Sequence, residues 1–505
     1  MLWLLHPIQL LPVLHVVQRM TSLSALFLLA ALQLHICGRE RGGCAGGVWV
    51  ALAWAVLWPL SFFSKETGVL FPAFALAWEL IIRRWASVRL DRFARSLFGL
   101  GALTLLAGLA YGLSPTAQWL WAGYDLRAFS LVERLMTEAR VVWFYLGLIV
   151  LPRIEALGLY HDDIVVSTSL FSPWTTLPAL LGLAGLLGLA WSVRTRAPLL
   201  AFGIVWFLIG HSLESTVLPL ELAHEHRNYI PLFGIVLAGA WALLYSLENT
   251  GPRKTVGIAL AGTALVYFSM VTALRAHQFG DEVRRTQLEA QHHQRSARAQ
   301  HQAGVALAAL PAAALPASPI YAFARRHYEI AGELDPDFKM SWLGLIHLGC
   351  SAGVPVKQVE VAELGRRLRE RPFAPGDRSV LYNLKEMSVA GTLCLSRPDI
   401  EGLFAAALTN ASVSAGVKAI LYSWYADYLW LHARDLAAAR GALQHSLALN
   451  PENSSNRLKS AQLMVISGEP KPARQMLLDL RNEKLSAEEQ KTLDELLAAF
   501  NIARH

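Results

Sequence analysis

Charged residues are scarce in this chain of 505 residues. Asp, Glu, Lys and Arg make up 16% of it, whereas hydrophobic residues make up 54%. This balance is too apolar for one soluble globule and indicates a polytopic membrane protein, whose first partner is the lipid bilayer. The sequence also lacks a Gly-rich phosphate loop, a Ser-His-Asp order, zinc-finger spacing and a dinucleotide fingerprint, so the signatures of several common soluble enzymes are excluded.

The excess of basic residues does not indicate a nucleic-acid partner. The formal net charge is +7, but much of this excess is Arg in short loops between apolar runs. No basic patch with interleaved aromatic residues is present. We therefore expect no binding of nucleic acid.

Cysteine is also rare, with only four residues. Cys37 and Cys44 flank a short loop that we expect to be cytoplasmic, so they should be free thiols. Cys350 and Cys394 lie in the C-terminal half and could pair if that half is periplasmic. Their separation in sequence says nothing about their distance, so two buried thiols are an equally good reading.

Long apolar runs fill the first 275 residues, and most approach the length that a helix needs to cross the hydrocarbon layer. The runs are 22–36, 46–63, 68–82, 97–112, 178–193, 198–210, 229–247 and 255–274. The run 141–151 is shorter, and we expect it to dip into the membrane or lie along its surface. The segment 1–17 is broken by His6 and Pro12, is not a convincing signal peptide, and is interpreted as a partial element. Domain 1–275 should thus contain about eight full spans.

The basic residues between these runs predict the orientation. Eleven of them fall in four loops: Arg39, Arg41, Arg83, Arg84, Arg89, Arg92, Arg95, Arg194, Arg196, Arg253 and Lys254. Because basic loops stay in the cytoplasm, the other loops should face outward. The last span then delivers domain 276–505 to the periplasm, so we expect a multi-pass protein of the cytoplasmic (inner) membrane.

The C-terminal domain is predicted to be soluble and helical. From Arg275 onward the chain contains 27 Lys and Arg residues and 24 Asp and Glu residues. Small and aromatic residues recur there in a pattern typical of tetratricopeptide (TPR) helix pairs. The residues at these positions are Ala324, Tyr328, Ala331, Pro336, Trp342, Ala439, Leu443 and Pro451. A generic stack of α-hairpins is the alternative. Either array is an all-α solenoid that offers a concave surface to a protein partner.

Residues 211–231 are unusually rich in ionisable side chains for a loop between two apolar runs. Seven occur within 21 residues: His211, Glu214, Glu221, His224, Glu225, His226 and Arg227. Ionisable groups at a membrane are costly unless they are used. An ordinary solvated loop is the alternative, but the density of these groups favours a membrane-surface site for an anionic ligand.

Several motifs resemble blocks of one known family. In chain order they are the opening HPIQLLPVLHVVQRMTSLSALF, Ser64-Lys65-Glu66, Glu133-Arg134 through Arg140, Leu151-Pro152, His161-Asp162-Asp163, and Glu225-His226-Arg227-Asn228-Tyr229-Ile230-Pro231. They resemble the bacterial form of the transmembrane-and-TPR family of O-mannosyltransferase-like proteins. The resemblance implies a GT-C-like membrane bundle that transfers a sugar from a polyprenyl-phosphate donor to periplasmic acceptor proteins.

The resemblance leaves the catalytic residue unassigned. Members of the family carry paired acidic residues in a first outer loop, ahead of the equivalent of His6-Pro7, and one of these acids is the catalytic base. This chain starts after that point, so we expect either a misplaced start codon or a truncated and inactive relative. A non-enzymatic, membrane-anchored TPR scaffold for envelope or pilus assembly is the alternative function.

The expected donor site consists of cations and supporting acids near the outer surface, because a lipid-borne phosphate needs fixed cations there. The phosphate-binding candidates are Arg227, His226, Arg19, Arg140, Lys65 and His211, and the supporting acids are Glu225, Glu221, Glu214, Glu66, Asp162 and Asp163. Arg227 is the first choice, since its planar guanidinium matches phosphate oxygens. Snorkelling to the interface is the alternative for Arg19, Arg140 and Lys65, and a helix N-cap is the alternative for the Asp pair.

A metal site is not predicted. The Glu and His residues of the loop could hold a divalent cation, and Asp162-Asp163 could serve a metal or the acceptor, but no ligand spacing defines such a site. The pair His292-His293 lacks fixed partners in the sequence. We therefore assign no metal ligand and no certain cofactor.

Overall fold

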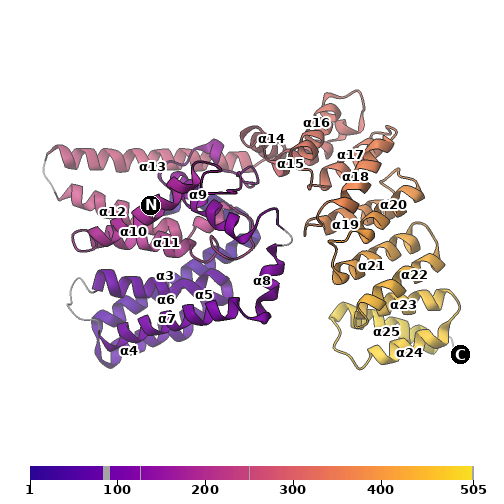
Figure 1. The fold of residues 1–505 in the computed structure, drawn as a ribbon, viewed down its shortest axis with the longest axis horizontal. Helices are drawn as coiled ribbons and strands as arrows, with labels where there is room; N and C mark the ends of the chain where they lie inside the picture. The colour runs from indigo at the N-terminus through magenta and orange to yellow at the C-terminus, as the bar shows by residue number, and fades with distance from the viewer. Residues whose placement is uncertain (84–90, 125–126, 249–250, 503–505) are drawn as a thin grey trace. The chain divides into compact units, whose positions relative to one another are not determined.

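The computed structural model describes residues 1–83, 91–124, 127–248 and 251–502. Helices make up 76% of the structure, and the described residues contain no strand, which confirms the all-α class. Arg84 and Arg89, two of the basic loop residues, lie outside the described residues. The chain divides into two compact units, Met1–Ala299 and Gln300–His505, and Figure 1 shows the helices of each.

The first unit begins with short helices and continues with long ones. Its first elements are α1 (Leu2–Leu5), η1 (Pro7–Gln9), α2 (Leu10–Leu14), η2 (Val16–Gln18), α3 (Arg19–Arg41), α4 (Gly43–Leu52), η3 (Ala53–Leu57), α5 (Trp58–Ser64), η4 (Glu66–Leu70), α6 (Phe71–Ala77), η5 (Trp78–Arg83) and α7 (Arg92–Gly112). The unit continues with η7 (Pro115–Ala117), α8 (Gln118–Ala122), α9 (Leu131–Val150), η9 (Ile154–Ala156), α10 (Thr176–Val193), α11 (Pro198–His211), η10 (Glu225–Asn228), α12 (Pro231–Leu247), α13 (Pro252–Phe279) and α14 (Glu282–His292). Helix α15 (Ala297–Ala308) begins at the C-terminal end of the first unit.

Five helical segments of the described chain are long and apolar enough to cross a membrane. They are Val16–Arg41, Gly43–Ser64, Arg92–Gly112, Thr176–Val193 and Pro252–Phe279. The expected runs 198–210 and 229–247 form the shorter apolar helices α11 and α12, and 68–82 is divided between η4, α6 and η5. The count of about eight full spans therefore stays a prediction, while the helical state of all eight runs is observed.

Helix α9 differs from the short separate segment expected at 141–151. It spans 20 residues and begins at Leu131, where Ser130 and Glu133 form a capping box. The capping box satisfies the first backbone N–H groups and lets the helix start in a charged stretch. Its first half carries Glu133, Arg134, Glu138 and Arg140, which explains why the apolar pattern alone shows only its second half.

Close helix contacts and aromatic side chains form the core of the first unit. A Cβ atom at Gly203 would lie 2.4 Å from the carbonyl oxygen of Gly234, so α11 and α12 approach each other through two glycines. Trp206 is fully buried, stacks on Phe74 with ring centroids 3.9 Å apart, and donates to the carbonyl of Ile230. Small residues at helix crossings are typical of membrane bundles, where packing rather than hydrophobicity holds helices together.

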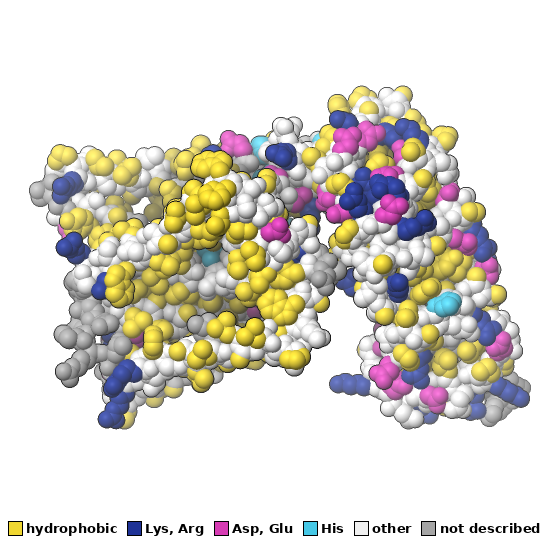
Figure 2. Space-filling model, in the orientation of Figure 1, with side chains coloured by type: hydrophobic (Ala, Val, Ile, Leu, Met, Phe, Trp, Pro, Cys, Tyr) yellow, Lys and Arg dark blue, Asp and Glu magenta, His cyan; other side chains and the backbone are white. Residues whose placement is uncertain are grey.

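The outer surface of the first unit is strongly apolar, as the yellow side chains in Figure 2 show. Large hydrophobic residues are exposed along α7, α10 and α13: Leu103, Leu106, Leu109, Leu181, Leu187, Trp191, Val256, Ile258, Leu260 and Val266. Apolar patches of this extent are rare on soluble monomers. They are the expected surface of helices that face lipid.

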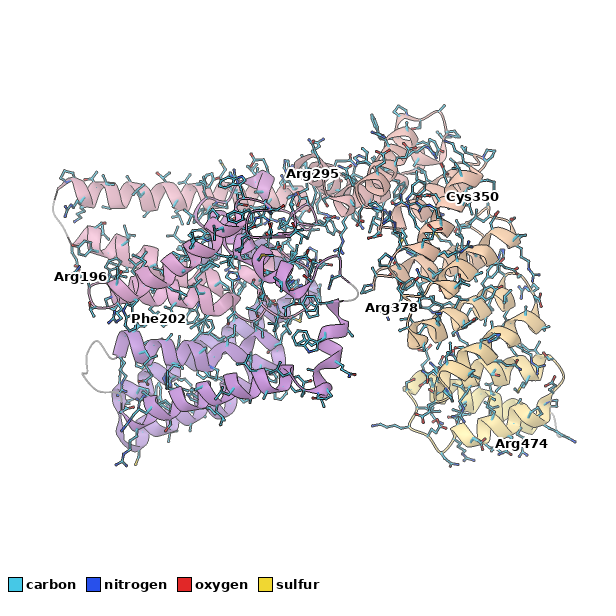
Figure 3. All side chains as sticks on the ribbon, in the orientation of Figure 1. Arg196, Phe202, Arg295, Cys350, Arg378 and Arg474 are labelled. Atoms are coloured by element: carbon cyan, nitrogen blue, oxygen red, sulfur yellow. A yellow bond between two sulfur atoms is a disulfide. The ribbon has the colours of Figure 1, made fainter. Side chains whose placement is uncertain are left out.

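Basic residues that the sequence predicts to be cytoplasmic lie at one end of the first unit. Arg39 of α3 and Arg83 of η5 both pair with Glu79 and Asp91, at distances between 2.5 and 3.0 Å. Figure 1 draws the end of α12 and the start of α13 on the left of the unit, the side on which Figure 3 labels Arg196.

The second unit consists of helices that mostly pack against a neighbour in the chain. Its helices are α16 (Pro319–Leu334), α17 (Met340–Ser351), α18 (Gln358–Glu370), α19 (Asp377–Val389), α20 (Arg397–Thr409), α21 (Ala415–Leu431), α22 (Leu436–Leu449), α23 (Ser454–Ile466), α24 (Pro470–Leu480) and α25 (Ala487–Ile502), preceded by η11 (Pro311–Ala314). Most of these helices contact the next one, whereas α18 packs against α20 and α19 against α21. The unit therefore has a continuous core of its own, which runs from Leu343 to Leu463.

The residues at the predicted repeat positions fall into two groups. Ala324, Tyr328, Ala331, Ala439 and Leu443 are buried. By contrast, Trp342 is half-buried and Pro336 and Pro451 are exposed after the ends of α16 and α22. The Tyr328 ring lies where a Cβ atom on Gly304 or Gly344 would stand, at 2.9 and 2.7 Å. Small residues thus allow these helices to pack closely.

Cys350 and Cys394 form a disulfide in the second unit, with their Cα atoms 5.2 Å apart. Cys350 lies in the last turn of α17, and Cys394 lies between α19 and α20; Figure 3 labels Cys350. The pairing that the sequence left open is therefore present. Cys37 and Cys44 are free, as expected.

Candidate functional site

Arg134 of α9 holds the loop between α11 and α12 in place. It is fully buried, and its guanidinium donates hydrogen bonds to three carbonyls of the loop: Glu214 (2.7 Å), Thr216 (2.9 Å) and Leu220 (2.5 Å). It also pairs at 2.8 Å with Glu138, one turn along the same helix. The rigid fork of donors in Arg suits this clamp, because several carbonyls can be bound in a fixed geometry.

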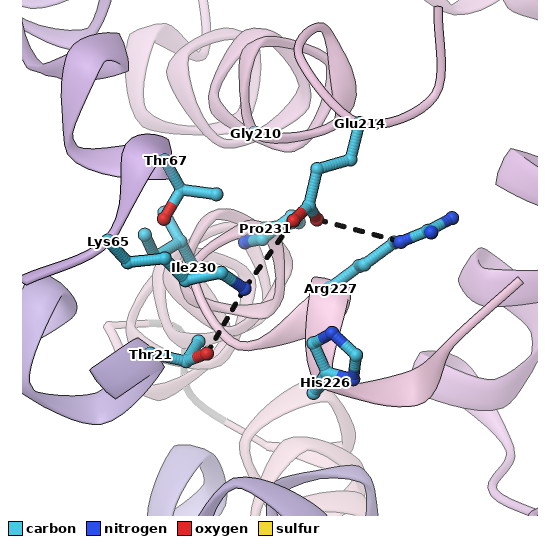
Figure 4. A pocket seen from close by; sticks show the side chains of 9 residues that line it. All are labelled: Thr21, Lys65, Thr67, Gly210, Glu214, His226, Arg227, Ile230 and Pro231. Carbon is cyan, nitrogen blue, oxygen red and sulfur yellow. Dashed lines mark hydrogen bonds and ion pairs between the residues drawn. The ribbon is translucent and has the colours of Figure 1, made fainter. Parts of the chain in front are cut away.

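A small pocket that is partly open to solvent lies beside this loop. It is lined by Thr21, Lys65, Thr67, Gly210, Glu214, His226, Arg227, Ile230 and Pro231. Figure 4 shows the side chains of Lys65 and Arg227 meeting at Glu214. The pocket thus brings together four predicted donor-site residues from separate parts of the sequence: Lys65, Glu214, His226 and Arg227.

Local structure positions the two cations of this pocket. Lys65 ends α5 with an extended backbone and caps it by donating its N–H to the Ser61 carbonyl. Arg227 lies in η10, directly before α12, and its guanidinium donates to the carbonyls of Glu221 (2.8 Å) and Leu222 (3.1 Å). Both cations therefore lie at the end of an apolar helix.

The pocket carries an excess of positive charge. Lys65 and Arg227 are only 5% and 6% exposed, and Glu214 is the sole carboxylate among the described residues that line the pocket. Glu214 lies 3.4 Å from Lys65 Nζ and 3.8 Å from Arg227 Nε, both longer than a close ion pair. Lys65 also donates to Thr21 Oγ1 at 3.1 Å. Two cations with one shared carboxylate can accept an anion.

His226 completes the polar wall of the pocket. Burial and then the positive charge of Lys65 lower the pKa of its imidazole well below the ordinary value. The ring is neutral at physiological pH and stacks on His224, with centroids 5.2 Å apart. A neutral imidazole carries one N–H donor for an anion and adds no further charge repulsion.

Glu225 and Glu221 are bound outside the pocket. Burial opposes ionisation of Glu225, but Arg275 at 2.7 Å holds its pKa below the usual range, and Gly158 N–H donates to it at 2.5 Å. Glu221 accepts from His224 at 2.8 Å and pairs with Arg298 at 2.6 Å, which keeps its pKa well below the ordinary value. These acids connect loops rather than face the pocket.

The two aspartates after α9 also bind neighbouring chain segments. Asp162 accepts from the Ser296 hydroxyl and from the backbone N–H of Arg298. Asp163 contacts His293 Nδ1 at 3.0 Å. Burial lowers the pKa of His293, but this hydrogen bond and the nearby carboxylates raise it above its usual value.

Four further predicted site residues also lie outside the pocket lining. Arg19 is exposed and donates to the Val13 carbonyl at 3.4 Å. Arg140 donates to the Val165 carbonyl at 2.6 Å and so holds the next loop. Glu66 is exposed in the first turn of η4. His211 is buried against Tyr145, with ring centroids 5.2 Å apart.

Sequence reasoning did not assign roles to Thr21, Thr67, Arg134, Arg275 and His293. Arg134 belongs to a motif that resembles the family, and this motif was the one signal that could have identified it. Thr21 and Thr67 are ordinary residues within helical segments; Thr21 is relevant because Lys65 donates to it, and Thr67 because it lines the pocket. No family model matches this chain, and no curated protein matches it either.

Proposed function

We propose that this chain is a membrane glycosyltransferase-like protein that binds the phosphate of a polyprenyl-phosphate-linked sugar in the pocket of Lys65 and Arg227, and that it serves periplasmic acceptor proteins. The observation that carries the proposal is the pair of buried cations with one shared carboxylate. A phosphate would supply the missing negative charge. It would accept charge-assisted hydrogen bonds from the ammonium and the guanidinium, which are the strongest kind.

The position of the two cations supports a lipid-borne ligand rather than a free anion. Lys65 follows the candidate span Gly43–Ser64, and Arg227 precedes the apolar helix α12. Ends of apolar helices lie at the depth of lipid headgroups. The exposed apolar surface of the unit offers contact to a polyprenyl tail. The resemblance of the motif blocks supplies the glycosyltransferase class, and the catalytic base stays unassigned.

The proposed location is the cytoplasmic membrane, with the second unit in the periplasm. The disulfide Cys350–Cys394 supports this, because such bonds persist in oxidising compartments. Arg39 and Arg83 meet at one end of the first unit, together with Glu79 and Asp91. The TPR-like interpretation of the second unit, with small buried residues at Ala324 and similar positions, supports a role in holding an acceptor protein.

A scaffold function is the second candidate. It is favoured by the second unit, which has a continuous core of its own and a disulfide. A membrane-anchored helical array needs no donor pocket. If the second unit alone restores function in a deletion strain, the scaffold interpretation replaces the interpretation as an enzyme.

Binding of a labelled polyprenyl phosphate to the full-length protein in nanodiscs tests the donor site. Lys65→Ala and Arg227→Ala should each weaken binding about 10- to 100-fold, since a hydrogen bond to a charged group contributes about 1.5–3 kcal/mol. Arg227→Lys should recover only part of the affinity, because Lys lacks the planar fork.

Matched controls are Arg253→Ala and Lys254→Ala, which remove the same side chains from exposed positions at the start of α13. Both controls should bind like the wild type. Equal affinities for the wild type, Lys65→Ala and Arg227→Ala would exclude this pocket as the phosphate site. Transfer of labelled sugar by the same preparations then tests the reaction itself.

A further inference from the structure

A second group of titratable side chains lies outside the phosphate pocket, where the loop after α9 meets the end of α14. His161 and Asp163 come from the loop, and His293 is the C-cap residue of α14. One ligand atom from each of the three lies within 4.8 Å of the other two. The rings of His161 and His293 stand edge to face, with centroids 5.3 Å apart. All three residues belong to the first unit.

Two buried imidazole nitrogens in this group make no hydrogen bond within the described part of the chain. The Nε2 atoms of His161 and His293 lack a hydrogen bond to any part of the chain that the structure describes. Their side chains are 1% and 7% exposed. A buried polar atom without a hydrogen bond is destabilising, so nearly all such atoms in folded proteins are satisfied. A metal ion takes nitrogen lone pairs, and for His293 the ring nitrogen next to the Asp163 carboxylate is Nδ1, at 3.0 Å.

Negative charge surrounds the two imidazoles. Asp163 lies 3.0 Å from His293 Nδ1, and Glu225 lies 3.8 Å from His161 Nε2. Arg275 lies 2.7 Å from Glu225 and pairs with that acid. Two carboxylates and two imidazoles with one Arg form an environment that suits a divalent cation.

The backbone around this group is held rigidly. Glu289 of α14 accepts from the N–H groups of Leu159 and Tyr160. A Cβ atom at Gly158 would lie 2.7 Å from His293 Nε2, so only glycine fits there without a shift of the ring. Metal sites depend on such second contacts to orient their ligands.

We propose that His161, Asp163 and His293 bind a divalent first-row transition-metal ion, with Zn²⁺ as the expected occupant. Imidazole nitrogens and a carboxylate are the donors that suit this class of ion. The ion would tie the loop after α9 to the end of α14, and its role would be structural because the group is buried. This proposal does not depend on the phosphate pocket, since the two sites share no lining residue.

The test uses the full-length protein in detergent, stripped with a chelator and titrated with Zn²⁺ or Co²⁺. The wild type should retain about one equivalent of metal after dialysis, measured by plasma mass spectrometry. His161→Ala and His293→Ala should each weaken retention at least about tenfold. His292→Ala, which removes the neighbouring imidazole on the same helix, should retain metal like the wild type.

A second measurement avoids reliance on variants that fail to fold. X-ray absorption of the Zn²⁺-loaded wild type should show two imidazole ligands and further light-atom ligands near 2.0–2.1 Å, the usual zinc–nitrogen distance. A wild type that retains no metal would overturn the proposal, and so would a spectrum without imidazole ligands. Equal retention by folded His161→Ala, His293→Ala and wild type would also overturn it. Polyprenyl-phosphate binding by the stripped protein separates a failure here from a failure of the proposed function.

Discussion

Replacement of Arg134 by Met should unfold the loop that carries the proposed donor site. The guanidinium is fully buried, pairs with Glu138 at 2.8 Å and binds three loop carbonyls. Met keeps most of the volume but leaves Glu138, which is 1% exposed, without its partner. Removal of one partner from a buried ion pair typically destabilises a protein by about 3–5 kcal/mol. Most of the expected loss comes from the unpaired carboxylate, and the three lost hydrogen bonds add to it.

A double-mutant cycle separates these two contributions. Arg134→Met/Glu138→Leu removes both charges, and we expect it to recover about 2 kcal/mol or more of the loss, because an apolar pair replaces an unpaired charge. Thermal unfolding in detergent measures the stability, and limited proteolysis across residues 212–224 measures the order of the loop. Arg153→Met is the matched control, since Arg153 is exposed in the loop after α9.

The outcome that would refute this reasoning is specific. If the double variant is as unstable as Arg134→Met, the unpaired carboxylate is not the cause of the loss. If Arg134→Met melts like the wild type and its loop resists proteolysis, Arg134 is not the clamp of this loop.

Three further predictions concern packing, the disulfide and pH. Gly203→Leu should weaken the α11–α12 contact and lower the melting temperature, whereas Gly239→Leu, at an open helix position, should not. The double variant Cys350→Ser/Cys394→Ser should destabilise the second unit by about 4 kcal/mol, which is the loop-closure value for the sequence separation of 44. Denaturant unfolding with and without reductant measures this loss. Identical unfolding curves for the variant and the wild type would contradict the prediction. Burial lowers the pKa of His301 to about 4, so the unfolded state takes up its proton first and stability should fall from pH 6.5 to pH 4, by at most about 3 kcal/mol. Hydrogen exchange in α16 measures this loss, and an unchanged pH dependence in His301→Gln would contradict it.

Much of the helical architecture could be predicted from the sequence. Every apolar run expected to be helical is helical, because a buried or lipid-exposed backbone must satisfy its hydrogen bonds within the segment. The start of α9 was missed, since the apolar pattern begins only at Val141, whereas the capping box of Ser130 and Glu133 starts the helix earlier. The length of α11, 14 residues, also shows that an apolar run does not by itself define a full span.

The candidate site was only partly predictable. The dense loop 211–231 contains Glu214, His226 and Arg227, three ionisable residues of the pocket, but Glu225 of the same loop faces Arg275 instead. A cluster in sequence separates in space because neighbouring residues of a loop point in different directions. Arg140 was expected near the phosphate because it is basic and near an apolar run, yet it binds the Val165 carbonyl.

By itself, the sequence of this protein determined where helices form, which of them are apolar, and where ionisable residues are concentrated. These properties depend on local hydrogen bonding, caps and hydrophobicity, which act over a few residues. Only the tertiary structure decided which charges meet: Lys65 with Glu214 and Arg227 in one pocket, and Asp163 with His293, which is 130 residues further along the chain. Such pairs depend on how distant helices pack, and a single sequence carries no direct signal for that distance.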